Sequence, residues 1–172
     1  MRIHITGASG SGTSTLAAAL AERLGAACLD GDAYYWLRPE PPFLDKRPAD
    51  ARRAMLSRDL QAAQHAVLGG AIIGWGTEVE DAFDLIVFLY LDAPIRLARL
   101  RERELQRFGA VDEAFIEWAG QYDQGPSEGR SLAKHRAWLA DRTCPVLALH
   151  GDLSVEARVE RVLAGLKSHG LM

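Results

Sequence analysis

The chain has 172 residues, of which 48% are hydrophobic and 25% charged, and its net charge at pH 7 is -3. A chain of this length is expected to form one domain around a single core. The balance of apolar and charged residues excludes a disordered chain and a generally basic nucleic-acid-binding protein. Cys28 and Cys144 follow no metal-binding or CxxC pattern, so we expect two small core residues in a reducing compartment.

No signal segment precedes "RIHITG", and no apolar run reaches the roughly 18 residues that span a bilayer. We therefore expect a cytoplasmic protein without a membrane or nucleic-acid partner, either a monomer or a homodimer.

Short apolar segments alternate with helical patterns, as is typical of β-α units that build a parallel sheet covered on both faces. The first strand is "RIHIT" at 2–6, and leucines at every fourth position predict a helix from Thr13 to Leu24, ended by Gly25. A second strand is expected at 26–29. Residues 30–48 carry four prolines, which predict a long loop.

The second half of the chain continues this alternation. Residues 49–68 place Met55, Leu60, Ala63 and Val67 at helical spacing before Gly69 and Gly70. The remaining expectations are a third strand "AIIG" at 71–74, a short connection at 75–84, a fully buried fourth strand at 85–91, helices at about 94–107, 113–123 and 130–141, a fifth strand at 146–150, and a last helix capped by Ser154.

The segment "GASGSGTST" at 7–15 lies between a predicted strand and a predicted helix. Backbone N–H groups and the positive end of the helix can together surround a phosphate there, and glycines let the backbone approach it closely. Ser14 occupies the position whose hydroxyl ligates Mg²⁺ in a nucleotide complex. Thr13, however, stands where a lysine is expected.

This loop resembles the Walker A motif of P-loop kinases, in the form found in nucleoside-monophosphate kinases and small-metabolite kinases. The segments "LDGD" at 29–32, "LYLDAPIRLARLRERE" at 89–104 and "HGDLS" at 150–154 extend the resemblance over nearly the whole chain. It implies a doubly wound α/β fold, with a five-stranded parallel sheet in the order 2-3-1-4-5, and ATP and Mg²⁺ as cofactors. The implied nucleotide-binding residues are Gly7, Ala8, Ser9, Gly10, Ser11, Gly12, Thr13, Ser14, Thr15 and, beside adenine, Asp152.

Loss of one preorganised cation costs roughly 3 kcal/mol of transition-state stabilisation, so we expect a replacement for the missing lysine. Arginines at 96, 99, 103 and 107 share one helix face, although a solvated face interleaved with glutamates explains the pattern too. In the resembling kinases, arginines of this helix and of the following lid lie over the transferred phosphoryl group. Arg99 and Arg103 match them as catalytic residues.

We expect the lid at about 108–136, inserted into the single domain at 1–172. Gly125 and Gly129 are its candidate hinges. The lid supplies three further candidates for the missing cation, which are Arg130, Lys134 and Arg136.

Asp30 and Asp32 follow the second strand, at the carboxyl edge where ligands of parallel sheets gather. By the resemblance, Asp32 acts at the acceptor as a catalytic base or helps to hold Mg²⁺. Asp30 supports it, and Ser14 completes the candidate metal ligands. A helix-capping turn is the alternative reading of the two carboxylates.

The acceptor segment is expected at about 32–68. Its aromatic residues, with those after the third strand, either cover a substrate or wedge a proline-rich loop onto the core. The candidate substrate-binding residues are Tyr34, Tyr35, Trp36, Arg53, Trp75 and Gly76. Arg38, Lys46, Arg52 and Arg53 are candidates to bind a phosphate of the acceptor.

These features together predict an ATP-dependent phosphotransferase acting on a small acceptor, a nucleotide or a nucleoside-like metabolite. The short connection at 75–84 resembles nucleotide kinases more than shikimate-type kinases. The alternative is a nucleotide-binding sensor or partner-binding module without transfer activity. A GTPase is disfavoured because the chain has no Asn-Lys-x-Asp motif.

Overall fold

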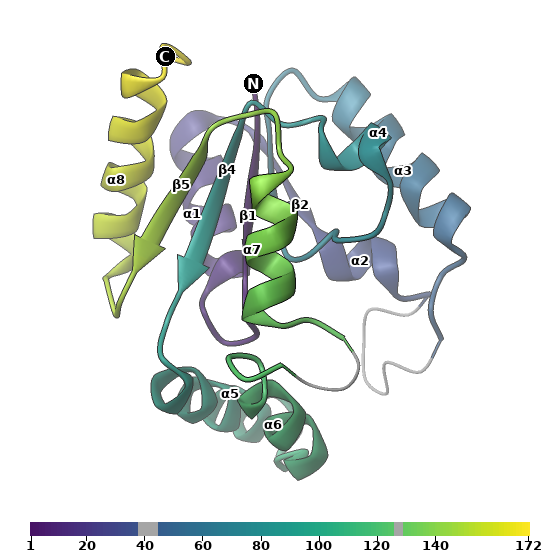
Figure 1. The fold of residues 1–172 in the computed structure, drawn as a ribbon, viewed down its shortest axis with the longest axis vertical. Coiled ribbons are helices and arrows are strands. Elements are labelled where there is room, and N and C mark those ends of the chain that lie inside the picture. Colours follow the sequence, from purple (N-terminus) through teal and green to yellow (C-terminus); the bar gives the residue numbers. More distant parts are fainter. Residues whose placement is uncertain (38–44, 126–128) are drawn as a thin grey trace.

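The computed structural model describes residues 1–37, 45–125 and 129–172. Within these ranges, five parallel strands form one sheet in the order β2-β3-β1-β4-β5, as predicted (Figure 1). The strands are β1 (Arg2–Gly7), β2 (Ala27–Asp30), β3 (Ala66–Gly69), β4 (Leu85–Tyr90) and β5 (Val146–His150). The helices are α1 (Thr13–Leu24), α2 (Gly31–Tyr35), α3 (Ala49–Ala62), α4 (Thr77–Glu80), α5 (Ala93–Phe108), α6 (Glu113–Gly120), α7 (Leu132–Ala140) and α8 (Val155–Ser168).

The helices cover both faces of the sheet. Alternate residues of β1, such as Ile3 and Ile5, pack against α1 and α8 in one core cluster. Leu56 and Trp138, from α3 and α7, belong to the cluster on the opposite face. Helices α5 and α6 lie beyond the carboxyl ends of the strands, so the candidate site is between them and the sheet (Figure 1).

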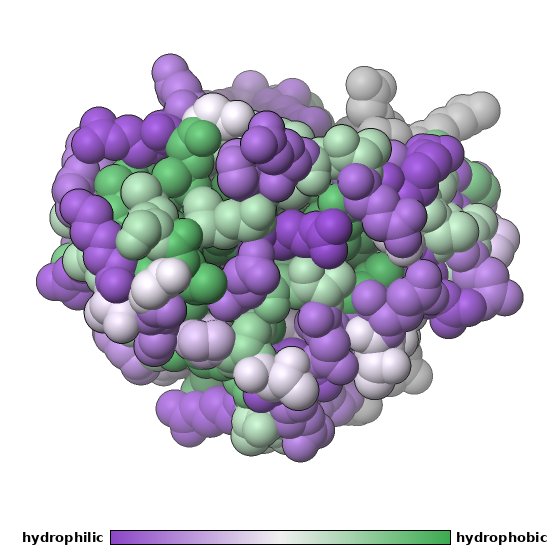
Figure 2. All heavy atoms as spheres, turned by 90° about the horizontal axis from the view of Figure 1, so that it is seen from above, coloured by the Kyte–Doolittle hydropathy of each residue, from purple (hydrophilic) through white to green (hydrophobic). Residues whose placement is uncertain are grey.

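The amino-terminal end of the sheet lies away from this region, and Figure 2 views that end of the molecule. Hydrophilic and hydrophobic side chains are interspersed there. Within the described ranges, no helix combines the length and the apolar character needed to cross a membrane.

The predicted third strand is wrong by five residues. Strand β3 covers Ala66–Gly69, and Val67 pairs with Ile3 of β1 instead of extending a helix. Helix α3 ends at Ala62, because Ala63 has an extended backbone (φ -85°, ψ 131°). Every residue of β3 is buried between two neighbouring strands. A strand buried on both faces is apolar throughout, so its sequence could be read as one more turn of the preceding helix.

The loop expected at 30–48 contains regular structure at its start. The Asp30 carboxylate accepts a hydrogen bond from the Asp32 backbone N–H at 3.0 Å and so caps the short helix α2. Trp36 and Lys46 then form an isolated antiparallel bridge. Arg38, a candidate phosphate ligand, lies outside the described residues.

The connection before β4 is longer than predicted, because β3 ends at Gly69 and the connection therefore starts at residue 70. It also contains the one-turn helix α4. The helices expected at about 94–107, 113–123 and 130–141 correspond to α5, α6 and α7. The Ser154 cap of α8 is confirmed, since its hydroxyl accepts from the Ala157 backbone N–H at 3.1 Å.

Candidate functional site

The glycine loop joins β1 to α1, and its glycines allow a backbone conformation and close packing that larger residues would not. Gly10 and Gly12 have φ values of 81° and 93°, a region that favours glycine. A Cβ atom at Gly7 would lie 2.5 Å from the Leu89 carbonyl oxygen, so no larger residue fits. Gly12 is the N-cap of α1 and supplies no side-chain cap, which leaves the first N–H groups of the helix for a ligand.

The three residues after Gly12 present hydroxyl groups. Thr13 is half-buried, whereas Ser14 and Thr15 are exposed. Within the described part of the chain, no protein group forms a hydrogen bond with any of these three hydroxyls. Ser14 is therefore available to a metal ion, and Thr13 contributes no positive charge.

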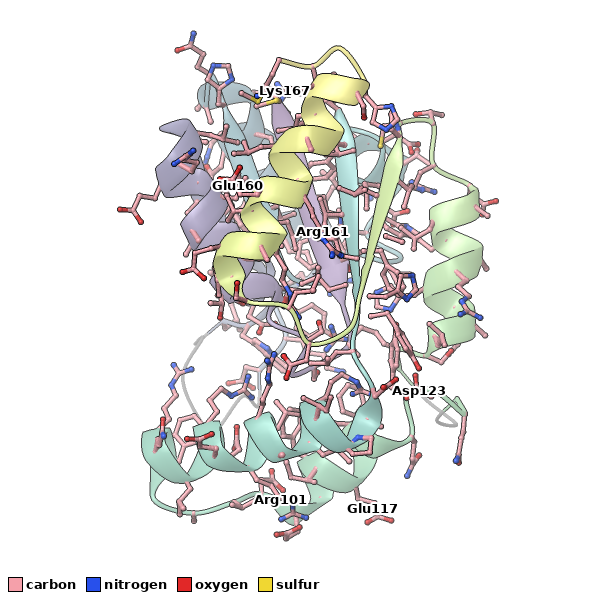
Figure 3. All side chains as sticks on the ribbon, turned by 90° about the vertical axis from the view of Figure 1, so that its left-hand side faces the viewer. Arg101, Glu117, Asp123, Glu160, Arg161 and Lys167 are labelled. Atoms are coloured by element: carbon pink, nitrogen blue, oxygen red, sulfur yellow. The ribbon has the colours of Figure 1, made fainter. Side chains whose placement is uncertain are left out.

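The first arginine at the loop is Arg96 of α5, whose side chain is buried. Its Nη1 donates to the carbonyl oxygens of Ser9 and Ala119, both at 3.3 Å, and its Nη2 donates to Asp123 at 3.2 Å. Figure 3 shows Asp123 between the sheet and the α5–α6 unit, whereas Glu117 lies on the side of that unit facing away from the sheet. Arg96 thus fixes the α5–α6 unit against the glycine loop.

The second arginine is Arg130, which precedes α7. Its Nη2 donates to the Ser9 hydroxyl at 3.2 Å, and its guanidinium lies 5.8 Å from the ring centre of Trp118. Desolvation lowers the pKa of Arg130, whereas the nearby Asp32 carboxylate raises it. Ser9, Trp118 and Arg130 line a cavity of about 10 Å³ with Tyr122, roughly the space of one water molecule.

The third arginine is Arg158 of α8, which the sequence analysis missed. Its Nη1 donates to the Ser11 carbonyl oxygen at 2.8 Å, and its Nη2 donates to that of Gly151 at 3.3 Å. Burial lowers the pKa of the Arg158 guanidinium. The burial of Arg158 could have been predicted from helical spacing. Arg158 lies three residues after Val155 and four before Val162, so it falls on the apolar stripe of the helix.

The other three arginines of the predicted stripe on α5 differ from Arg96. Arg99 pairs with Asp152 in the loop after β5, so the two residues are brought together by the fold. Arg103 donates to Glu104 at 3.1 Å and also lowers the pKa of Asp32. Arg107 is exposed against the ring of its neighbour Phe108. Arg99 and Arg103 therefore lie near other predicted site residues, whereas Arg107 contacts none of them among the described residues.

Asp30 and Asp32 lie at the carboxyl end of β2, beside the glycine loop. Gly69 pairs with Asp30, and a Cβ atom built on Gly69 would lie 3.3 Å from the Ser14 Cα atom. Desolvation and Asp30 raise the pKa of Asp32, whereas Arg130 and Arg103 lower it. The carboxylate of Asp32 thus interacts electrostatically with one acidic and two basic side chains from other parts of the site.

Magnesium ligands at this edge would come from Ser14, Asp30 and Asp32. In the described ranges, no group of three or more His, Cys, Asp or Glu side chains is placed to hold a metal ion. Hydroxyl and carboxylate oxygens suit Mg²⁺, which usually keeps several waters and binds through one or two carboxylates plus substrate phosphates. The residues present fit an ion that arrives with a nucleotide.

The predicted substrate-binding aromatics divide into two groups. Tyr34 is buried, and its hydroxyl donates to Asp59 of α3 at 2.9 Å, so it anchors α2 to the core. Tyr35 stacks on Trp75 with ring centres 6.3 Å apart, and Trp36 meets Tyr35 edge-on at 4.8 Å. The second group brings together α2 and the segment after β3.

Arg53 lies beside Gly76, where a Cβ atom would be 3.5 Å from its side chain. Its guanidinium donates to Asp50 at 2.7 Å and lies 3.9 Å from Glu78. This predicted phosphate ligand therefore already has carboxylate partners.

The fold and the glycine loop define the structural class. The chain is similar to a shikimate kinase from Bacteroides thetaiotaomicron (TM-score 0.64, 22% identity, 97% of this chain and 98% of that one). It is also similar to a putative kinase from Chloroflexus aurantiacus j-10-fl (TM-score 0.60, 19% identity, 98% and 96%). A gluconokinase from Sinorhizobium meliloti 1021 is similar as well (TM-score 0.55, 19% identity, 97% and 91%). The fold is that of the P-loop small-metabolite kinases.

No family model matches the chain. The uncharacterized protein YqaC of Bacillus subtilis (strain 168) is 47% identical over 177 residues, which cover 97% of this chain and 98% of that protein. The chain belongs to the same protein family as YqaC.

Proposed function

We propose that this protein is an ATP-dependent phosphotransferase that moves the γ-phosphoryl group of ATP to a small acceptor. The observation that carries the proposal is the group of arginines on the glycine loop. Arg96 and Arg130 bind Ser9, and Arg158 binds Ser11. Phosphoryl transfer depends on positioning and charge. Arginines from other elements can therefore replace the lysine that is missing at position 13, where Thr13 stands.

The three arginines have different parts in this proposal. Arg96 and Arg158 donate to backbone carbonyl oxygens and are buried, so they hold the loop in shape. Arg130 binds a side-chain hydroxyl and interacts electrostatically with Asp32, so it is the candidate to stabilise the transferred group. Arg103 shares this interaction with Asp32 and is the second candidate.

The remaining site residues act on the two substrates. The backbone from Gly7 to Thr15 binds the phosphates of ATP through its N–H groups. Asp32 accepts the proton of the acceptor hydroxyl, since its surroundings raise the pKa of its carboxyl group. Arg99 and Asp152 close the nucleotide side by pairing α5 with the loop after β5. Ser14 and Asp30 would hold Mg²⁺, which would neutralise charge on the phosphates when bound.

The acceptor is either a hydroxylated metabolite or a nucleotide. The matched solved structures include a shikimate kinase and a gluconokinase. The short connection predicted at 75–84 favoured a nucleotide as the acceptor. The connection in the structure begins at residue 70 and contains α4, so its length no longer favours a nucleotide over a hydroxylated metabolite.

The test is ADP release from Mg-ATP against shikimate, gluconate, nucleosides and nucleoside monophosphates. We expect acceptor-dependent turnover with at least one class. Nucleotide binding without turnover on any acceptor would contradict the proposal and favour a binding module that has lost transfer activity.

A further inference from the structure

Tyr122 follows α6 and is a buried residue that joins several parts of the candidate site. Its hydroxyl oxygen lies 2.6 Å from Nδ1 of His135 on α7. Its ring centre lies 5.2 Å from the guanidinium carbon of Arg96, and its backbone oxygen accepts from the Leu132 N–H at 2.9 Å. Burial raises the pKa of the Tyr122 hydroxyl, which is therefore a neutral hydrogen-bonding group.

His135 extends this contact to β1. Its Nε2 lies 3.2 Å from the hydroxyl oxygen of Thr6, the residue directly before the glycine loop, and both residues are fully buried. Burial lowers the pKa of His135 to about 3, so the neutral ring has one donor and one acceptor nitrogen. Either tautomer completes the chain, because the hydroxyl groups of Tyr122 and Thr6 can each donate or accept.

Arg130 lies two residues before the start of α7, where this chain ends. Tyr122 fixes the first turn of α7 through two links, which are its backbone oxygen to Leu132 and its hydroxyl to His135. The side chains of Tyr122 and Arg130 also line the same small cavity and interact electrostatically. The position of Arg130 is therefore tied to that of Tyr122.

The other end of α7 has its own anchor in the core. Trp138 packs in the core cluster on this face of the sheet, and its Nε1 donates to the buried Glu80 carboxylate at 2.7 Å. Arg142, just after the helix, pairs with Asp81 at 2.7 Å. These contacts do not involve Tyr122, so the chain from Tyr122 to Thr6 acts on the end of α7 that follows Arg130.

A buried polar chain whose members are all satisfied makes the segments that it joins rigid. The guanidinium of Arg130 donates to the Ser9 hydroxyl in the glycine loop at 3.2 Å. A charge held rigidly at that place stabilises a phosphoryl group without a cost of reorganisation. Rigid support of Arg130 is thus a requirement for its part in the reaction.

We propose that Tyr122 is a positioning residue, which acts with His135 and Thr6 to hold Arg130 at the glycine loop for the phosphates of ATP. Tyr122 touches neither substrate and works through the arginine. This inference rests on the proposed function for the contact between Arg130 and ATP.

The test is a double-mutant cycle on the binding of Mg-ATP, measured by calorimetry without an acceptor. Tyr122→Phe removes the hydroxyl and should raise the dissociation constant about twofold to tenfold, and Arg130→Gln should raise it roughly tenfold to a hundredfold. The double variant should bind like Arg130→Gln alone, because Tyr122 acts through Arg130. If Arg130→Gln binds too weakly to measure, Arg130→Lys takes its place in the cycle.

Two further variants separate positioning from stability. Thr6→Val removes the hydroxyl at the other end of the chain and should weaken ATP binding as Tyr122→Phe does. Ile3→Val is the matched control, since Ile3 is buried in the core near the start of β1 and its truncation also lowers stability. It should bind ATP like the native protein, and a melting curve of each variant measures its stability.

Native ATP binding in Tyr122→Phe would overturn the inference. Effects of Tyr122→Phe and Arg130→Gln that multiply in the double variant would do the same, because a merely structural role gives independent effects. The predicted cycle without turnover of any acceptor would uphold the inference and contradict the proposed function. Turnover with multiplying effects would have the opposite meaning, and a native protein that does not bind ATP would contradict both.

Discussion

Arg158, near the start of α8, donates a 2.8 Å hydrogen bond from Nη1 to the carbonyl oxygen of Ser11, which lies 147 positions earlier in the chain. The same guanidinium donates to Gly151 in the loop after β5 at 3.3 Å. A Cβ atom at Gly12 would lie 2.9 Å from this Nη1, so the loop and the arginine fit closely. The last helix thus determines the shape of the first loop.

Arg158→Gln should lower both stability and ATP affinity. A buried side chain that loses its hydrogen bonds to two carbonyl oxygens reduces the free energy of unfolding by about 1–3 kcal/mol. Chemical denaturation measures this change, and calorimetry measures ATP binding. Arg161→Gln, an exposed position on the same helix (Figure 3), should behave like the native protein. Equal effects of the two substitutions would remove the special role of Arg158.

Asp32→Asn should lower turnover about 10²- to 10⁴-fold without changing the fold, because the acceptor loses its general base. The native rate should fall on acidification through a pKa above the usual 3.8 of aspartate, since desolvation and Asp30 raise it. Initial rates between pH 4 and 8 measure this. Asp50→Asn at an exposed position is the control. A variant with native turnover would show that Asp32 is not the base.

Glu80→Ala should destabilise the protein by about 1–3 kcal/mol, because the Arg142 guanidinium loses the carboxylate 3.4 Å away and keeps only that of Asp81, 2.7 Å away. Trp75 and Trp138 also lose their shared acceptor. Denaturation followed by tryptophan fluorescence measures the loss. Replacing the exposed Glu78 by Ala should change stability by no more than about 0.5 kcal/mol. Similar losses at both positions would contradict this assignment.

Stability should fall as the pH drops from 6.5 towards 4, because two histidines are buried as neutral rings. Burial is the main cause that lowers the pKa of His4 to about 4 and that of His135 to about 3. The unfolded chain, with histidine pKa values near 6.5, therefore binds more protons in this window, and unfolding gains up to about 1.4 kcal/mol per pH unit for each histidine.

Denaturation curves at several pH values test this dependence. His135 contacts Thr6 at 3.2 Å and Tyr122 at 2.6 Å, so His135→Gln keeps a polar side chain that cannot titrate. In His135→Gln, the slope of the unfolding free energy against pH should decrease by the contribution of one histidine. An unchanged slope in the variant would show that His135 does not control acid stability.

Much of the candidate site could be placed from the sequence because its signals are local. The glycine loop, the two carboxylates after β2 and the fully apolar strand β4 each depend on neighbouring residues. Arg96 was predicted as one of four arginines on one helix face, but among these four it is the one that is buried and holds the loop. The stripe showed that α5 carries arginines and could not show which of them faces Ser9.

The features that were missed depend on tertiary contacts. Val67 fitted a helical stripe and lies in β3, since a strand buried on both faces has no alternation that separates it from a helix. Arg158 gains its role from a partner far away in the chain, the carbonyl oxygen of Ser11. No local spacing specifies such partners.

The central claim is that arginine replaces the lysine of the glycine loop, and turnover of Arg130→Gln in a Thr13→Lys background tests it most directly. Arg130→Gln alone should lose about 10²- to 10³-fold in turnover, the cost of one preorganised charge. The added lysine should restore part of that loss, because both cations serve the same phosphates. Native turnover in Arg130→Gln, or activity that appears only with Thr13→Lys, would contradict the account.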